Sequence, residues 1–220
     1  MILFASVIVV GFLIGFLVGG RLSGFEHVRI EWWGLAIAGL AVQFIPLPEG
    51  ANGTDLLVRT IVLAVSYALL LTCAARNVRT PGMPLILLGL ALNAAVIVAN
   101  GGMPVSEEAL RTSGQDAVLA DLQDAGADKH HLESDGDVLR PLGDVIGVPP
   151  PVSQAISIGD VIVYVGLIWL VVSVMRGRSQ PSSSSGPGYQ GRHRPDRPPE
   201  PTPSRPDRSL PAATTWGTER

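Results

Sequence analysis

Cysteine is almost absent from this chain, because Cys73 is the only one among 220 residues. A single thiol excludes an intramolecular disulfide. Cys73 lies within an apolar run, which is typical of a small packing residue. Lysine is equally scarce, with Lys129 alone against fifteen arginines. This arginine bias indicates a GC-rich bacterial genome.

Charge is also sparse, since Asp, Glu, Lys and Arg together make up 16% of the residues and the formal net charge is −3. So small a net charge gives no reason to expect a nucleic-acid partner. Familiar catalytic motifs are missing as well, because the chain has no GxSxG, Walker loop, HExxH or CxxC. We therefore predict no catalytic residue, no metal ion and no cofactor, and lean towards a function that is not enzymatic.

Long apolar runs dominate what is present. Hydrophobic residues make up 47% of the chain, the mean hydropathy is +0.35, and the apolar residues come in long blocks. Blocks of about 18 apolar residues can cross a bilayer as helices. We predict an all-α integral membrane protein whose residues 1–176 form the transmembrane domain, with about five transmembrane helices at 2–18, 32–47, 56–75, 84–99 and 158–175.

Positive charge is distributed unevenly between the ends of these runs. Arginines fall in three connections, after the first, third and last runs, namely Arg21 and Arg29, Arg76 and Arg79, and Arg176 and Arg178. Because positive residues mark cytoplasmic ends, we predict a multi-pass protein of the bacterial cell (inner) membrane with its N-terminus outside and its C-terminus in the cytoplasm. Residues 177–220 are rich in Pro, Ser and Arg, and we predict that they form a disordered cytoplasmic tail.

The segment 100–157 is too long for a plain connector, and it holds ten acidic residues against three basic ones between Glu107 and Asp144. We predict that it forms a structured outer loop. It opens with a turn at Asn100-Gly101-Gly102-Met103-Pro104-Val105-Ser106, where glycine permits unusual backbone angles and proline fixes its own φ. We expect Asn100 to close the preceding helix, Ser106 to cap a short helix, and residues 117–123 to form another.

On this topology, polar side chains gather at the outer face and predict a ligand-binding site. The candidates are Arg59, Asn93, Asn100, Gly101, Gly102, Met103, Pro104, Ser106, Lys129, His130, Asp144 and Asp160. The alternative is a structured cap whose polar groups bond only to each other and to water. Metal binding is a weaker alternative, because the adjacent His130 and His131 point different ways and do not follow a familiar ligand spacing.

Two ionisable residues lie inside the predicted spans near this face. Arg59 follows the start of the third span by one turn, where its side chain would either snorkel to the interface or pair with an acidic group of the loop. Asp160 opens the last span, and burying its charge would cost about 2.5–3.5 kcal/mol. We therefore predict that Asp160 is paired, protonated or hydrated.

Small residues recur every four positions in the first span, at Gly11, Gly15 and Gly19. Such a face lets membrane helices approach closely, either within one chain or between copies. The predicted partner is therefore the lipid bilayer. The glycine face predicts packing inside the chain, with a homo-oligomer formed through the same face as the alternative.

Four short motifs follow one another along the chain. They are Asn-Gly-Gly-Met-Pro-Val-Ser at 100–106, Lys-His at 129–130, Leu-Gly-Asp-Val-Ile at 142–146 and Ser-Ile-Gly-Asp at 157–160. Their order resembles the bacterial multi-span membrane proteins of the DUF5317 family, over roughly residues 1–176. The resemblance implies a multi-span membrane domain, but the family has no known function. The matched positions are Asn100 to Ser106, Lys129, His130, Gly143, Asp144, Gly159 and Asp160.

Three classes of function stay open. The first is a non-enzymatic membrane protein whose outer cap binds a small ligand or a partner protein. The second is a transporter or a transporter accessory subunit, because ionisable groups inside a membrane often mark transport paths. The third is a membrane enzyme acting on a lipid-linked substrate, with His130 as general base and Asp144 as the residue that orients it.

Overall fold

The computed structural model describes residues 2–45, 53–124 and 129–177. All of them belong to one unit that ends at Pro181. Apart from its first residue, the predicted tail lies outside the described residues, as does the end of the predicted second span at 46–47.

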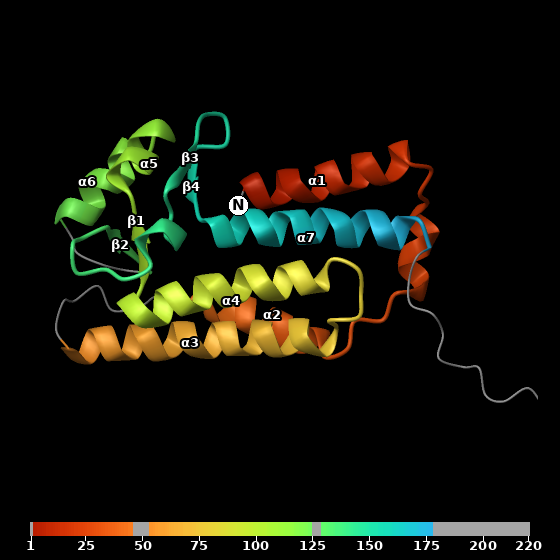
Figure 1. The fold of residues 1–220 in the computed structure, drawn as a ribbon, viewed down its shortest axis with the longest axis horizontal. Coiled ribbons are helices and arrows are strands. Elements are labelled where there is room, and N and C mark those ends of the chain that lie inside the picture. Colours follow the sequence, from red (N-terminus) through yellow and green to blue (C-terminus); the bar gives the residue numbers. More distant parts are fainter. Residues whose placement is uncertain (1, 46–52, 125–128, 178–220) are drawn as a thin grey trace, which may run out of the picture. The chain divides into compact units, whose positions relative to one another are not determined.

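Five apolar helices form the body of the described unit (Figure 1). Helix α1 packs on α7, α7 on α4, α4 on α3, and α3 on α2. The bounds of the helices agree with the predicted spans to within a few residues, except that α2 ends early: α1 (Ile2–Leu17), α2 (Trp33–Val42), α3 (Gly53–Arg76), α4 (Met83–Asn100) and α7 (Ile158–Met175). A short 3-10 helix, η1 (Leu22–His27), follows α1 and lies against α7.

Three of these helices, α3, α4 and α7, are long and apolar enough to cross a membrane. Helix α1, with 16 residues, and α2, with 10, are apolar but shorter. A helix rises about 1.5 Å per residue, so ten residues span only about half of a hydrocarbon core. The mostly helical structure with three candidate spans fits an integral membrane protein, and five complete spans stay a prediction.

Glycines allow a close contact between helices α4 and α7. A Cβ on Gly89 of α4 would collide with the main-chain oxygen of Gly159 on α7. Further along, a Cβ on Gly166 would lie 2.8 Å from Cγ1 of Ile86. Small residues facing each other let two backbones approach, so this seam holds the two helices in one register.

The glycine face of α1 also packs inside the chain. A Cβ on Gly11 would lie 3.2 Å from Cβ of Val171, and one on Gly15 would lie 2.9 Å from Cε of Met175, both on α7. Gly19 has open space around it. Gly11 and Gly15 thus follow the alternative of packing within the chain, and a homo-oligomer through this face stays a prediction.

The segment between α4 and α7, residues 101–157, is ordered over its described part and is called the cap below. Its elements are β1 (Met103–Val105), α5 (Glu107–Thr112), α6 (Asp116–Asp124), β2 (His130–Leu132), η2 (Arg140–Leu142), β3 (Ile146–Val148) and β4 (Gln154–Ile156). Strands β1 and β2 pair in parallel, whereas β3 and β4 form an antiparallel hairpin. The prediction of an all-α fold is therefore wrong for the cap, while both predicted cap helices are present.

Side chains from several cap elements share a small apolar core. Val105 of β1, Leu110 of α5 and Leu119 of α6 are almost fully buried against one another. Since strands of three residues are too short to be stable alone, this shared core and the contacts with α4 hold the strands in place.

Candidate functional site

The turn after α4 is built as the glycines and Asn100 predict. Helix α4 ends at Asn100, and Gly101 takes a left-handed conformation with φ of 71°. The Asn100 side chain donates from Nδ2 to the carbonyl oxygens of Val96 and Val138, each at 2.9 Å, and its Oδ1 accepts from the Val138 amide. Asn100 therefore closes α4 and also ties it to the cap.

Arg59 supports the same turn from α3. Its side chain is buried, with the residue only 4% exposed, and Nε donates to the carbonyl oxygen of Gly101 at 3.0 Å. The interpretation of Arg59 as a snorkelling residue is wrong, because its guanidinium group donates a hydrogen bond inside the protein.

Asp144 is fixed beside β1 by main-chain hydrogen bonds. Its amide donates to the carbonyl oxygen of Pro104 at 2.9 Å, and its carbonyl oxygen accepts from the Ser106 amide at 3.1 Å. A Cβ on the preceding Gly143 would lie 2.6 Å from the Pro104 oxygen. The absence of a side chain there lets the Asp144 segment lie against β1.

Asp160 opens α7 in a reciprocal N-terminal cap. The Asp160 amide donates to Oγ of Ser157 at 3.0 Å, and Oδ2 of Asp160 accepts from the Ser157 amide at 3.1 Å. Asn93 of α4 completes the cluster, since its Nδ2 donates to Oδ1 of Asp160 at 2.7 Å and its Oδ1 accepts from Ser157 Oγ at 2.9 Å. Of the three predicted states of Asp160, namely paired, protonated or hydrated, these hydrogen bonds fit the first.

The Asp144 carboxylate is bonded much less completely. The residue is 6% exposed, and Oδ2 lies 3.6 Å from Nε2 of His130. Oδ1 is the only buried side-chain nitrogen or oxygen atom without a hydrogen-bond partner among the described residues. Burial, followed by the nearby charge of Asp160, raises the pKa of Asp144 to about 8. A buried carboxylate oxygen without a donor is costly to keep, which makes Asp144 a candidate ligand contact.

A cavity of about 130 Å³ lies where the cap meets the helix ends, and it is called the small cavity below. It is lined by Gln43, Leu63, Tyr67, Asn93, Ile97, Met103, Lys129, His130, Asp144 and Asp160. The ammonium group of Lys129 donates to the main-chain oxygen of Gln43. Two carboxyl groups thus face the cavity against one ammonium group, with a histidine beside them.

The predicted site residues divide into two groups by position. Lining the small cavity are Asn93, Met103, Lys129, His130, Asp144 and Asp160. The others form the supporting turn or hold it, namely Arg59, Asn100, Gly101, Gly102, Pro104 and Ser106. The sequence interpretation did not include Tyr67 and Gln43, which also line the small cavity. It also left Ser157 out of the site, although Ser-x-x-Asp before an apolar run is a helix-capping signal.

The two adjacent histidines face different partners, as predicted. His130 lies near Asp144, whereas Nε2 of His131 is 3.0 Å from Oδ1 of Asp137. Among the residues that the structure describes, no group of three or more His, Cys, Asp or Glu side chains is placed to hold a metal ion.

Residues 27–172 match the model of a family described as a family of unknown function, DUF5317. The match covers more than half of the chain. This chain belongs to the DUF5317 family. The matched region of this DUF5317 member contains the complete lining of the small cavity. No curated protein and no solved structure matches the chain.

Proposed function

We propose that this chain is a five-pass membrane protein that binds a small, positively charged hydrogen-bond donor in the small cavity. The proposed membrane is the bacterial inner membrane, with the cap outside and the C-terminal end of α7 at the cytoplasm. The unpartnered Oδ1 of Asp144 is the observation that carries the binding proposal.

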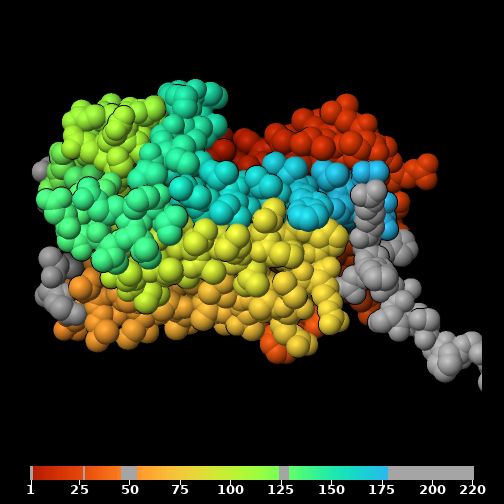
Figure 2. All heavy atoms as spheres, in the orientation of Figure 1, coloured from red at the N-terminus to blue at the C-terminus, as the bar shows by residue number. Residues whose placement is uncertain are grey.

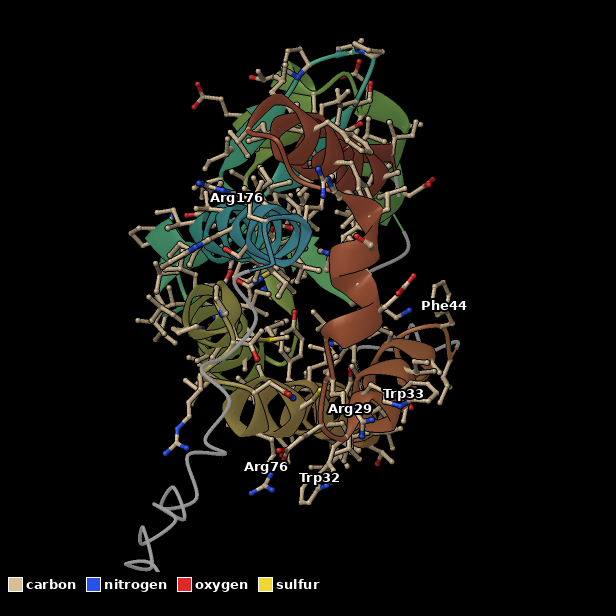
Figure 3. The ribbon with its side chains drawn as sticks, turned by 90° about the vertical axis from the view of Figure 1, so that its right-hand side faces the viewer. Arg29, Trp32, Trp33, Phe44, Arg76 and Arg176 are labelled. Atoms are coloured by element: carbon tan, nitrogen blue, oxygen red, sulfur yellow. The ribbon has the colours of Figure 1, made fainter. Side chains whose placement is uncertain are left out.

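Charge at the end opposite the cap supports this orientation. Figure 3 looks onto that end and shows Arg29, Arg76 and Arg176 there. Trp32 and Trp33 lie at the same end and are 55% and 63% exposed, as expected of residues at a lipid interface. The Arg76 guanidinium group lies 4.8 Å from the centre of the Trp32 ring.

Charge in the small cavity favours a cationic ligand. Asp144 faces Asp160, His130, Lys129 and Tyr67 across the cavity. The Lys129 ammonium group is already bound to a main-chain oxygen. The carboxyl group of Asp144, a lining residue with one oxygen still without a donor, is therefore the acceptor proposed for the ligand. An ammonium group supplies both the missing donor and an opposite charge, and such charge-assisted hydrogen bonds are about twice as strong as neutral ones.

Binding should depend on pH through Asp144. Its raised pKa of about 8 means that the carboxyl group is mostly protonated at neutral pH. A cation prefers the ionised form, so binding below that pH must release a proton. We expect the affinity to fall by up to about tenfold for each pH unit below 8 and to level off above it.

The test is isothermal titration of the full chain in a neutral detergent with ethylammonium chloride, at pH 9 and at pH 6. We expect tighter binding at pH 9, and a loss of about tenfold or more in Asp144→Asn. Asp137→Asn is the matched control, because Asp137 is also a cap carboxylate but is satisfied by Ser134 and His131. Equal affinity in Asp144→Asn and the wild type would overturn the proposal.

A membrane enzyme is the second candidate, favoured by the distance of 3.6 Å between His130 Nε2 and Asp144 Oδ2. That spacing lies just beyond hydrogen-bond range, and such contacts often tighten when substrate binds. The two candidates differ in what happens to the ligand. A binding protein returns it chemically unchanged, and an enzyme does not.

A further inference from the structure

A second cavity adjoins the small cavity and is called the large cavity below. Its volume is about 610 Å³, and it lies between the cap and the start of α1. His130 and Asp144 line both cavities. In Figure 2 the surface is hollowed where the teal part of the cap meets the red helix α1. The two cavities therefore share Asp144, the residue with a carboxylate oxygen that has no donor.

The two cavities differ in size and in lining. The small cavity holds about four water volumes at about 30 Å³ each, enough for a head group and no more. The large cavity falls in the range of about 300–1,000 Å³ that is usual for ligand sites. Its walls are mostly apolar away from Asp144 and His130, and include Ile2, Leu110, Val118, Leu122 and Ala155.

The position of the large cavity indicates where its occupant comes from. Ile2 begins the apolar helix α1 and is 60% exposed, and Val118 on the cap side is 39% exposed. An apolar wall that is partly open and lies beside the start of a membrane helix gives access to hydrocarbon chains at the bilayer surface. A purely water-soluble ligand would leave this apolar surface uncovered.

From these observations we infer that the ligand is a membrane amphiphile, with an ammonium head group at Asp144 and a hydrocarbon chain in the large cavity. The inference rests on the proposed function for the ammonium head group, and adds a separate site for the hydrocarbon tail of the ligand. The head is recognised by the unpartnered Oδ1, and the chain by apolar side chains from α1, α5 and α6.

The experiment uses the full chain at pH 9 with alkylammonium chlorides of two, six and ten carbons, kept below their micelle concentrations. We expect decylammonium to bind at least about tenfold more tightly than ethylammonium, because more apolar surface is buried. The gain should level off at a chain length that fills the large cavity. A gain that rises evenly with length, as partition into detergent does, would overturn the inference.

Two variants test the binding of the hydrocarbon tail separately from the binding of the head group. Val118→Trp fills the large cavity, so it should abolish most of the advantage of decylammonium and leave ethylammonium binding unchanged. Val138→Trp is the control, because Val138 is an exposed cap valine at 52% that does not line either cavity. If Val118→Trp still binds decylammonium more tightly than ethylammonium by the full wild-type factor, the hydrocarbon site in the large cavity is wrong. The head-group site at Asp144 is then unaffected. If Asp144→Asn binds ethylammonium as the wild type does, the proposed function itself fails.

Discussion

Two buried asparagines, one near each end of the helices, show how differently a polar cluster can be completed. Asn77, just after α3, donates from Nδ2 to the main-chain oxygens of Glu31 and Cys73, each at 2.8 Å, and accepts from the Glu31 amide at 2.8 Å. Asn93, towards the cap, bonds instead to the side chains of Asp160 and Ser157.

The two clusters differ in whether a buried polar atom beside them is left without a hydrogen-bond partner. Around Asn77 the partners are mostly main-chain groups, which do not titrate, and the cluster ties the end of α3 to the segment before α2. Around Asn93 the partners include a carboxylate, and the neighbouring Asp144 retains an oxygen without a donor. A cluster that the chain completes itself is structural, whereas one with a buried acceptor to spare is suited to a ligand.

The largest expected effect comes from breaking the Asn93 cluster at Gly159. In Gly159→Ala the new Cβ would lie 2.7 Å from Cγ of Asn93 and 2.9 Å from the Gly89 oxygen. Overpacking and the loss of the Asn93 hydrogen bonds should together cost about 3–6 kcal/mol. We expect most of the folded protein to be lost, measured by size-exclusion chromatography in detergent. Gly34→Ala is the control, because a Cβ there meets open space. An equal loss of folded protein in Gly34→Ala would contradict the proposed role of the close contact between α4 and α7.

The next effect has the opposite sign, because Asp144→Asn should stabilise the protein at high pH. In an unfolded chain this carboxyl group ionises near 3.8, whereas in the fold its pKa is about 8. Wild-type stability should therefore fall as the pH rises from about 4 to 8 and stay flat above. We expect Asp144→Asn to be more stable by about 2–4 kcal/mol at pH 9 and nearly neutral at pH 4, measured by unfolding in SDS.

Asp137→Asn should have the opposite effect on stability from Asp144→Asn. Burial alone would raise the pKa of Asp137, but hydrogen bonds from His131 and Ser134 lower it overall. Asp137 therefore adds stability above its unfolded pKa, and this contribution is lost as the pH falls through the lower folded value. The variant should be less stable than the wild type at pH 7. If Asp137→Asn and Asp144→Asn changed the free energy of unfolding in the same direction, the hydrogen-bonded environment of Asp137 and the incompletely bonded environment of Asp144 would be wrongly assigned.

The helices could be predicted well because their ends carry local signals. An apolar run sets the length of α4 and α7, and Gly101 and Ser157 mark where one ends and the other begins. The strands could not be predicted in this way. Strand β1 has three residues, too few to show an alternating pattern, and its partner β2 lies on the far side of two helices in the sequence.

The site could be predicted only in outline. The acidic loop and its histidine indicated that Asp144, Asp160 and His130 belong to one face. The sequence could not show that Tyr67 of α3 faces the same cavity, because α3 is apolar around most of its circumference and its rotation follows from packing. The missing donor at Asp144 Oδ1 is likewise a property of the assembled structure.

The smallest expected effect tests the completed cluster, through Asn77→Ala. Removing this side chain leaves the part-buried amide of Glu31 without its acceptor, and leaves the Glu31 carbonyl oxygen with Sγ of Cys73 at 3.8 Å. We therefore expect a loss of about 1–3 kcal/mol in SDS unfolding. The loss should be the same from pH 5 to pH 9, because main-chain groups do not titrate. Arg76→Gln is the matched control, since Arg76 and Glu31 form an exposed ion pair at 3.0 Å whose loss should cost less than about 1 kcal/mol. A loss in Asn77→Ala that changes with pH, as at Asp144, would mean that this end of the protein also holds a titrating site, and the contrast between the two ends would fail.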